Sequence, residues 1–286
     1  MPEEEYVGAC VYWRHLANRN EDLIRMESGK TRRLRRITRE DSKTFIIAMD
    51  HGVTLGPVRG LDNMQETVKS VVKGGADAVL VHKGIAKHVD THNTGLIVHV
   101  SASTKYGSKP NLKVGVCTVE EAVRLGADAV SVHINVGSEQ EDEMLESLGS
   151  LSERCDSYGI PLLAMMYPRG PTIKNEHEFE AVSHAARIGA ELGADMVKTV
   201  YTGDIESFRR VVRSCPVPVV VAGGPVMKTD LDVLELGQNS MRAGAAGLSF
   251  GRNVFQHVKT EAMTKALASI IHNATSAQDA LKLLGE

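Results

Sequence analysis

A lysine inside an apolar run is the side chain with the clearest capacity for chemistry. Lys198 lies in the segment DMVKTVY, with apolar residues on both sides. Burial disfavours an ammonium group, lowers its pKa and frees the amine to attack a carbonyl carbon. We interpret Lys198 as a nucleophile that forms a Schiff base. The alternative is a structural ion pair with Asp50 or Asp204.

Two further polar residues, Asp50 and Tyr167, end apolar runs. Asp50 closes TFIIAMD, where a carboxylate can move a proton or hold a substrate hydroxyl; otherwise it caps the next helix. Tyr167 begins Tyr-Pro-Arg-Gly, whose proline stiffens the exit from the run. Its phenol could act as a general acid or base, and the alternative is an amphipathic core residue.

Glycine turns follow the last two apolar runs. They are Gly223-Gly224-Pro225 and Gly251-Arg252. Backbone N–H groups exposed by glycine can hold a phosphate, and an arginine adds a charged contact. Each glycine alone could be a tight turn, but the pair favours a phosphate site.

Lys83 and four histidines offer competing chemistry. Lys83 also ends an apolar run, but its place before Gly84 suggests a rim lysine for a phosphate or carboxylate. The histidines could surround a divalent metal ion. They lack HxH or HExxH spacing and an accompanying acidic set, so we predict no metal and interpret each as a core or substrate-contact residue. These histidines are His51, His82, His99 and His133.

The elements that must position these residues are short apolar runs separated by helix-like stretches. Nearly continuous hydrophobicity is typical of strands buried on both faces of a parallel sheet. The eight runs cover residues 44–50, 76–83, 96–101, 128–134, 162–167, 195–201, 217–223 and 246–251.

A repeated Gly-Ala pattern precedes several of these runs, as in GGADAV (74–79), LGADAV (125–130) and LGADMV (192–197). Glycine there ends a helix, so the repeat predicts βα units in series. We predict the α/β class and a (β/α)8 TIM barrel over residues 43–286, with an N-terminal helical extension at 1–42. An open doubly wound sheet is the alternative, but no G-x-G-x-x-G follows the first run. A barrel enzyme builds its site at the carboxyl ends of the strands, where the residues above lie.

Three segments outside the runs have their own interpretation. TKYGSKPN (104–111) is predicted to be a surface loop, and RGPTIKNEHE (169–178) an active-site loop or lid. The basic stretch at 30–36 could contact phosphates, but we favour a solvated helix face or an oligomer contact.

Composition limits the class of protein. Hydrophobic residues make up 42% and charged residues 24%, and the net charge of −3 offers no general attraction for nucleic acid. No apolar run reaches the roughly 18 residues that a membrane span needs. The four cysteines are far apart, and no secretion signal begins the chain. We therefore expect a cytoplasmic protein with small-molecule substrates and neither nucleic-acid nor membrane partners.

From about residue 40 onward, long motifs resemble the archaeal-type class I aldolase family. They are MDHG (49–52), GGADAVLVHKGI (74–85), ADAVSVHINVGS (127–138), AMMYPRG (164–170), GADMVKTVYTGD (193–204), VVVAGGP (219–225) and GRNVFQH (251–257). The resemblance implies that Lys198 is the Schiff-base lysine, Tyr167 the proton donor and Asp50 its acidic partner. It further implies substrate contacts at His51, Gly52, Val53, Thr54, Lys83, His133, Arg169, Gly223, Gly224, Gly251 and Arg252.

The resemblance also implies the reaction. Family members that cleave fructose 1,6-bisphosphate tend to carry tryptophan two residues before the tyrosine, whereas this chain has Met165. That difference favours a transaldolase-type transfer from 6-deoxy-5-ketofructose 1-phosphate to L-aspartate semialdehyde, in aromatic amino acid biosynthesis through 3-dehydroquinate. Class I fructose-bisphosphate aldolase activity is the alternative. The resemblance implies no cofactor and a homo-oligomer such as a decamer, and it leaves residues 1–25 without a role.

Overall fold

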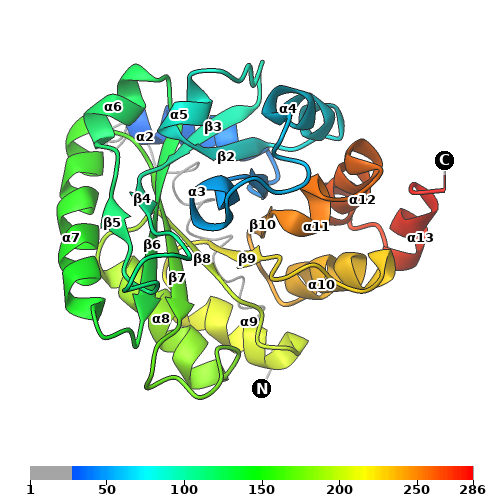
Figure 1. Ribbon diagram of the computed structural model, residues 1–286. Coiled ribbons are helices and arrows are strands. Elements are labelled where there is room, and N and C mark those ends of the chain that lie inside the picture. Colours follow the sequence, from blue (N-terminus) through cyan, green and yellow to red (C-terminus); the bar gives the residue numbers. More distant parts are fainter. Residues whose placement is uncertain (1–27, 286) are drawn as a thin grey trace.

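Eight parallel strands close into one barrel in the computed structural model, which describes residues 28–285 (Figure 1). The hydrogen-bonded order is β1-β10-β9-β8-β7-β6-β3-β2. Each predicted apolar run overlaps one barrel strand, so the (β/α)8 barrel is confirmed and the open sheet is wrong. The strands are β1 (Thr44–Ala48), β2 (Ala78–His82), β3 (Gly95–His99), β6 (Ala129–Val136), β7 (Leu162–Pro168), β8 (Met196–Thr199), β9 (Val219–Ala222) and β10 (Gly247–Phe250).

Helices surround the barrel (Figure 1). Within the described part of the chain, no helix is both long and apolar enough to cross a membrane. The helices are α2 (Ser28–Ile37), α3 (His51–Leu55), α4 (Met64–Lys73), α5 (Lys83–Ala86), α6 (Val119–Arg124), α7 (Glu141–Tyr158), α8 (Phe179–Glu191), α9 (Ile205–Ser214), α10 (Asp230–Arg242), α11 (Arg252–Phe255), α12 (Thr260–Asn273) and α13 (Ala277–Lys282).

The Gly-Ala repeat places a left-handed residue between a helix and the next strand. Gly75, Gly126 and Gly193 have φ of 92°, 81° and 92°. Glycine adopts this conformation without a steric penalty, so each helix ends there and the chain turns back into the barrel. The strands that follow are almost completely buried, as their continuous hydrophobicity predicts.

A short hairpin lies outside the barrel and was not predicted. β4 (Ser101–Ala102) pairs antiparallel with β5 (Val114–Gly115). Strands of two residues are too short to produce a periodic signal. The predicted loop at 104–111 connects them and is exposed, and the Lys105 N–H donates to the Thr54 carbonyl on α3 (3.1 Å). The hairpin therefore carries residues 103–113 to the barrel mouth.

The basic run on α2 pairs with aspartates at the opposite end of the barrel, where the strands begin. Lys30 binds Asp195 (2.9 Å), and Arg36 binds Asp128 (2.7 Å). Lys30 is only 15% exposed, so the predicted solvated face is wrong for this residue. Lys30 and Arg36 attach α2 to its own barrel, whereas Arg32 and Arg35 of the run are exposed.

The same repeat aspartates also hold neighbouring strands together. Asp128 accepts the Leu96 N–H (3.0 Å), and Asp195 accepts the Leu162 N–H (2.8 Å). Each carboxylate therefore joins an α2 cation to the backbone at the start of another strand. A charge-assisted bond of this kind is stronger than a neutral one.

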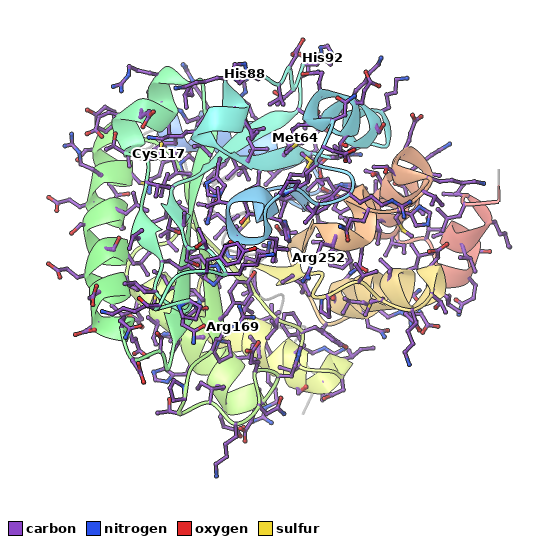
Figure 2. All side chains as sticks on the ribbon, in the orientation of Figure 1. Met64, His88, His92, Cys117, Arg169 and Arg252 are labelled. Carbon is purple, nitrogen blue, oxygen red and sulfur yellow. The ribbon has the colours of Figure 1, made fainter. Side chains whose placement is uncertain are left out.

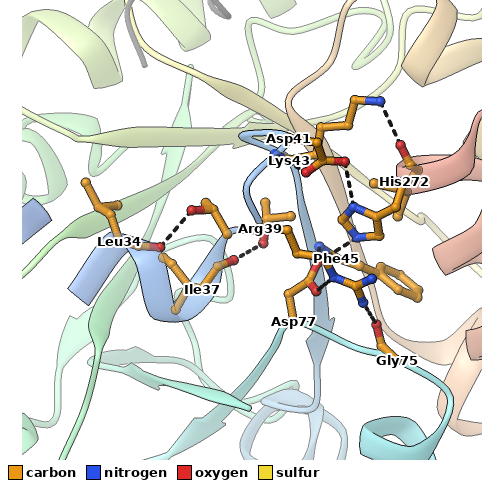
Figure 3. A network of polar contacts seen from close by, with 12 residues as sticks. Leu34, Ile37, Arg39, Asp41, Lys43, Phe45, Gly75, Asp77 and His272 are labelled. Carbon is orange, nitrogen blue, oxygen red and sulfur yellow. Dashed lines mark hydrogen bonds and ion pairs between the residues drawn. The ribbon is translucent and has the colours of Figure 1, made fainter. Parts of the chain in front are cut away.

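Asp77 is the centre of the largest of these networks (Figure 3). It accepts the Phe45 N–H of β1 (2.7 Å), pairs with Arg39 and contacts His272 Nε2 of α12 (2.9 Å). The other ring nitrogen of His272 contacts Asp41 (2.8 Å). One buried carboxylate therefore connects β1, the segment after α2 and α12.

We predict that Asp77→Ala lowers the free energy of unfolding by about 3 kcal/mol, because it leaves a buried N–H and a buried imidazole without their acceptor. Urea unfolding followed by circular dichroism measures this. Lys282→Ala is the control, since it removes only an exposed i,i+3 ion pair and should leave the midpoint unchanged. Equal midpoints for Asp77→Ala and the wild type would contradict the role of this network.

Candidate active site

A pocket of about 330 Å³ opens at the carboxyl ends of the barrel strands. Eleven predicted site residues from distant parts of the chain line it: Asp50, His51, Thr54, His133, Tyr167, Arg169, Lys198, Gly223, Gly224, Gly251 and Arg252. Two other cavities lie elsewhere, one beneath α2 and one behind the hairpin, and neither contains Lys198, Tyr167 or Asp50. The possible catalytic groups are thus gathered at the barrel mouth.

Lys198 projects from β8 into this pocket and is only 5% exposed. Burial lowers the pKa of its amine to about 8, although the charge of Asp50 acts in the opposite direction. Within residues 28–285 no carboxylate forms an ion pair with Lys198. Asp204 instead caps α9, accepting the N–H groups of Glu206 (3.0 Å) and Ser207 (2.9 Å). The geometry therefore favours the nucleophile over the structural ion pair.

This pKa sets an expected pH dependence. Only the free amine attacks a ketone, and roughly half of Lys198 is free at pH 8 against about one molecule in a hundred at pH 6. The rate of imine formation at limiting ketone should therefore rise about tenfold per pH unit below 8 and level off above it. Rates of borohydride-trappable imine formation between about pH 6 and 9.5 measure this, and a flat profile would contradict it.

Asp50 lies between β1 and α3, but its side chain makes no hydrogen bond that caps the helix. Its carboxylate oxygens are 3.7 Å from His51 Nδ1 and 3.9 Å from His99 Nε2. Burial would raise the pKa of Asp50, but its neighbours His99, His51 and Lys198 outweigh that effect and lower it. An ionised carboxylate thus faces the pocket and can accept a proton.

Two neighbouring histidines, His82 and His99, lie close to Asp50. The rings of His82 and His99 lie 5.2 Å apart, and His99 Nδ1 is 2.8 Å from Ser131 Oγ. Burial lowers the pKa of His99 to about 4, so the ring is neutral at pH 7. In the part of the chain described, no group of three or more His, Cys, Asp or Glu side chains is arranged to hold a metal ion.

Tyr167 is the penultimate residue of β7 and is 8% exposed. The ring of His133 packs edge-on against it at 4.8 Å, and the guanidinium of Arg169 lies 5.5 Å from its centre. Burial first, and then the charge of Asp50, raise the pKa of the phenol. Tyr167 therefore keeps its proton at neutral pH and can donate it to an oxygen on the substrate.

The glycine turns after β9 and β10 line the pocket on the side of β8 opposite to β7. Gly224 has φ of 65°. A Cβ on Gly251 would lie 2.6 Å from His51 Cε1 and 2.8 Å from the Ala48 carbonyl oxygen. Only glycine fits at this position without a shift of the backbone or of His51.

Three buried polar atoms beside these turns have no hydrogen-bond partner among the described residues. They are His51 Nδ1, Ser249 Oγ and Arg252 Nε. Such atoms are costly unless a ligand or water satisfies them. Their presence next to the glycine turns favours a polar, anionic ligand such as a phosphate.

Some predicted residues lie outside the pocket, and some lining residues were missed. Gly52 and Val53 are exposed on α3, and Lys83 pairs with Glu121 of α6 (2.9 Å). The missed polar residues are Lys113, which follows an irregular loop, and Ser249, which lies inside an apolar run. Neither position carries a local signal beyond its residue type.

The family of the protein follows from this architecture and from a direct match. The DeoC/LacD family aldolases match residues 44–257, from the first residue of β1 to just beyond α11. The chain belongs to this family. It is therefore an aldolase-family enzyme, and the barrel mouth is where such an enzyme performs its chemistry.

Named relatives cover most of the chain. A 2-amino-3,7-dideoxy-D-threo-hept-6-ulosonate synthase from Halobacterium salinarum is 44% identical, over 91% of this chain and 97% of its own length. A 2-amino-4,5-dihydroxy-6-oxo-7-(phosphonooxy)heptanoate synthase from Streptomyces griseus is 41% identical, over 86% and 91%. Both names describe seven-carbon 2-amino acids.

Solved structures of family members share the fold closely. An archaeal fructose 1,6-bisphosphate aldolase is 36% identical and superposes with a TM-score of 0.80, covering 85% of this chain and 99% of the other. A structure of an archaeal fructose-1,6-bisphosphate aldolase with its catalytic lysine bound covalently to a carbinolamine intermediate has a TM-score of 0.79, with 36% identity and coverage of 85% and 99%.

Proposed function

We propose that this enzyme catalyses the reaction of a 2-amino-3,7-dideoxy-D-threo-hept-6-ulosonate synthase. Lys198 forms an imine with 6-deoxy-5-ketofructose 1-phosphate, and a three-carbon unit passes to L-aspartate semialdehyde. The observation that carries the proposal is a buried, partly deprotonated lysine in one pocket with a protonated tyrosine and an ionised aspartate. The identity of 44% to the Halobacterium enzyme supports this choice of substrates.

The proposed reaction breaks one carbon–carbon bond and forms another, and it requires no external oxidant or reductant. Lys198 Nζ attacks the C5 ketone of the donor, and loss of water gives an iminium ion. Removal of the proton from the C3 hydroxyl breaks the C3–C4 bond and releases hydroxypyruvaldehyde phosphate, while the electron pair moves into an enamine on Lys198. The enamine carbon then attacks the aldehyde of L-aspartate semialdehyde, and water hydrolyses the new imine.

Tyr167 and Asp50 divide the proton transfers. The Tyr167 phenol protonates the oxygen of the aldehyde that the enamine attacks, because burial keeps the phenol protonated. The ionised Asp50 accepts protons during formation and hydrolysis of the imine. The iminium nitrogen serves as the electron sink, so the scheme calls on no cofactor.

Fructose 1,6-bisphosphate cleavage is the second candidate, and one observation favours it. The glycine turns and Arg252 follow β9 and β10, and Ser249 lies in β10, so that together they could hold a phosphate on the carbon beside the imine. Fructose 1,6-bisphosphate carries a phosphate on that carbon, whereas the deoxy donor carries a methyl group there.

The test incubates the enzyme with each donor, with and without L-aspartate semialdehyde, and identifies products by mass spectrometry. We expect a seven-carbon 2-amino acid only when the deoxy donor and the semialdehyde are both present. Triose phosphates from fructose 1,6-bisphosphate as the sole efficient reaction would support the second candidate instead.

We also propose that the enzyme is cytoplasmic and forms a homo-oligomer. Cys117, Cys155 and Cys215 are free thiols, which fits a reducing cytoplasm. The homo-oligomer stays a prediction, and size-exclusion chromatography with light scattering measures it.

A further inference from the structure

Lys113 is a cation in the pocket that takes no part in the proposed bond-breaking and proton-transfer steps. It follows the exposed loop at 104–111 and lines the pocket together with Arg169. Its amine donates to Ser103 Oγ, and within residues 28–285 it forms no ion pair with a carboxylate. Its charge is therefore left for a ligand.

Arg169 is held beside Lys113 by its own loop. Its Nε and Nη2 each donate to a carboxylate oxygen of Glu176 at 3.0 Å, a bidentate pair that fixes the plane of the guanidinium. Burial and the charge of Arg169 both lower the pKa of Lys113. The fold thus brings two cations together at a cost that an anion between them would offset.

The charges lining the pocket are unbalanced. Lys113, Arg169, Lys198 and Arg252 line it with Asp50 as the one carboxylate among the lining residues, and Glu176, which pairs with Arg169, lies outside the lining. Arg252 belongs to the glycine-turn side, whereas Arg169 follows β7 on the other side of β8 (Figure 2). The pocket therefore offers two separate anion-binding ends, one on either side of Lys198.

The order in which bonds break and form indicates which groups bind at the Arg169 end of the pocket. The departing aldehyde and the entering aldehyde both react at the same enamine carbon on Lys198, so they occupy the same space in turn. Their carbonyl oxygens must lie near the Tyr167 phenol, and Arg169 stacks against that ring at 5.5 Å. In the proposed reaction both molecules carry an anionic group, since one has a phosphate and the other has a carboxylate beside its ammonium group.

We propose that Lys113 and Arg169 form a shared anion subsite that binds the phosphate of the departing aldehyde and then the carboxylate of the entering one. Lys113 makes the enzyme select aldehydes that carry a phosphate or carboxylate over aldehydes that carry neither. The glycine-turn end serves donors with a phosphate beside the imine carbon. This inference rests on the proposed function and deepens it.

The test uses hydroxyacetone as the donor, because it can form the enamine on Lys198 without an anion at the far end. Wild type, Lys113→Met and Lys113→Arg are assayed with L-aspartate semialdehyde and with propionaldehyde, a neutral acceptor. For Lys113→Met, kcat/KM should fall about 10- to 100-fold with the semialdehyde and change little with propionaldehyde. Lys113→Arg should recover most of the loss.

Lys105→Met is the matched control, since Lys105 is exposed in the same loop, does not line the pocket and should leave both rates unchanged. Borohydride trapping of hydroxyacetone on each variant separates two failures. If the wild type traps nothing, the proposed function fails and the subsite fails with it. If trapping and turnover are normal but Lys113→Met keeps the wild-type preference for the semialdehyde, the subsite alone is overturned.

Discussion

Replacing Lys198 with methionine is expected to reduce turnover by at least about 10⁴-fold, because it removes the amine that carries the three-carbon unit covalently in the proposed reaction. Methionine is of similar length and suits the apolar surroundings of β8, so the variant should be at least as stable as the wild type. Initial rates with the deoxy donor and L-aspartate semialdehyde measure the loss, and thermal unfolding measures the stability.

Lys83→Met is the matched control for this experiment. Lys83 also follows a barrel strand, but it pairs with Glu121 and does not line the pocket. Its replacement should leave turnover close to the wild-type value. Residual activity of Lys198→Met within tenfold of the wild type would remove Lys198 from the mechanism, and a large loss in Lys83→Met would return that lysine to it.

The second large effect is expected for Tyr167→Phe, which keeps the ring between His133 and Arg169 but removes the proton. A positioned general acid or base contributes about 10²- to 10⁴-fold, so kcat should fall by that amount. Imine formation depends chiefly on Lys198, so borohydride should still trap the ketone. The combination of a normal adduct and slow turnover is measured by mass spectrometry and steady-state rates on the same sample.

Tyr201→Phe tests whether any loss of a buried phenol has this effect. Tyr201 is 9% exposed, packs on Phe208 at 5.2 Å and does not line the pocket. Its hydroxyl has no hydrogen-bond partner among the described residues, so its removal should cost neither stability nor activity. Equal activities of Tyr167→Phe and Tyr201→Phe would exclude the proton-transfer role of Tyr167.

The barrel could be predicted because its strands are buried on both faces. Runs such as that at 217–223 must be apolar throughout, and a glycine such as Gly193 ends the helix before several of the strands. Both constraints act on neighbouring residues and so appear in a single sequence. β4 and β5 carry no such pattern, since two residues cannot display a period.

The candidate site could be predicted only where its residues lie at the ends of strands, since the sequence shows where strands end. Lys198, Asp50 and Tyr167 end or interrupt apolar runs, and a closed barrel brings such positions together. Lys83 follows the same local rule yet lies outside the pocket, because its partner Glu121 is 38 residues away in sequence. Lys113 shows the converse, since only the hairpin places it at the barrel mouth.

The basic run at 30–36 illustrates the same limit. Its charges suggested a solvated face, an oligomer contact or a phosphate contact. The structure uses Lys30 and Arg36 to bind Asp195 and Asp128, which belong to the repeat that precedes the strands. Charge complementarity between α2 and the repeat is visible once the barrel is closed, and spacing along the chain alone does not reveal it.

The Schiff-base role of Lys198 is tested most directly by finding the residue that carries the trapped ketone. The wild-type enzyme is incubated with the deoxy donor or hydroxyacetone, reduced with borohydride and digested, and the modified peptide is sequenced by mass spectrometry. We expect one adduct, with the three-carbon unit or the whole donor attached to Lys198 Nζ. An adduct on Lys83 or Lys113, or no adduct with any ketone that the enzyme turns over, would contradict it.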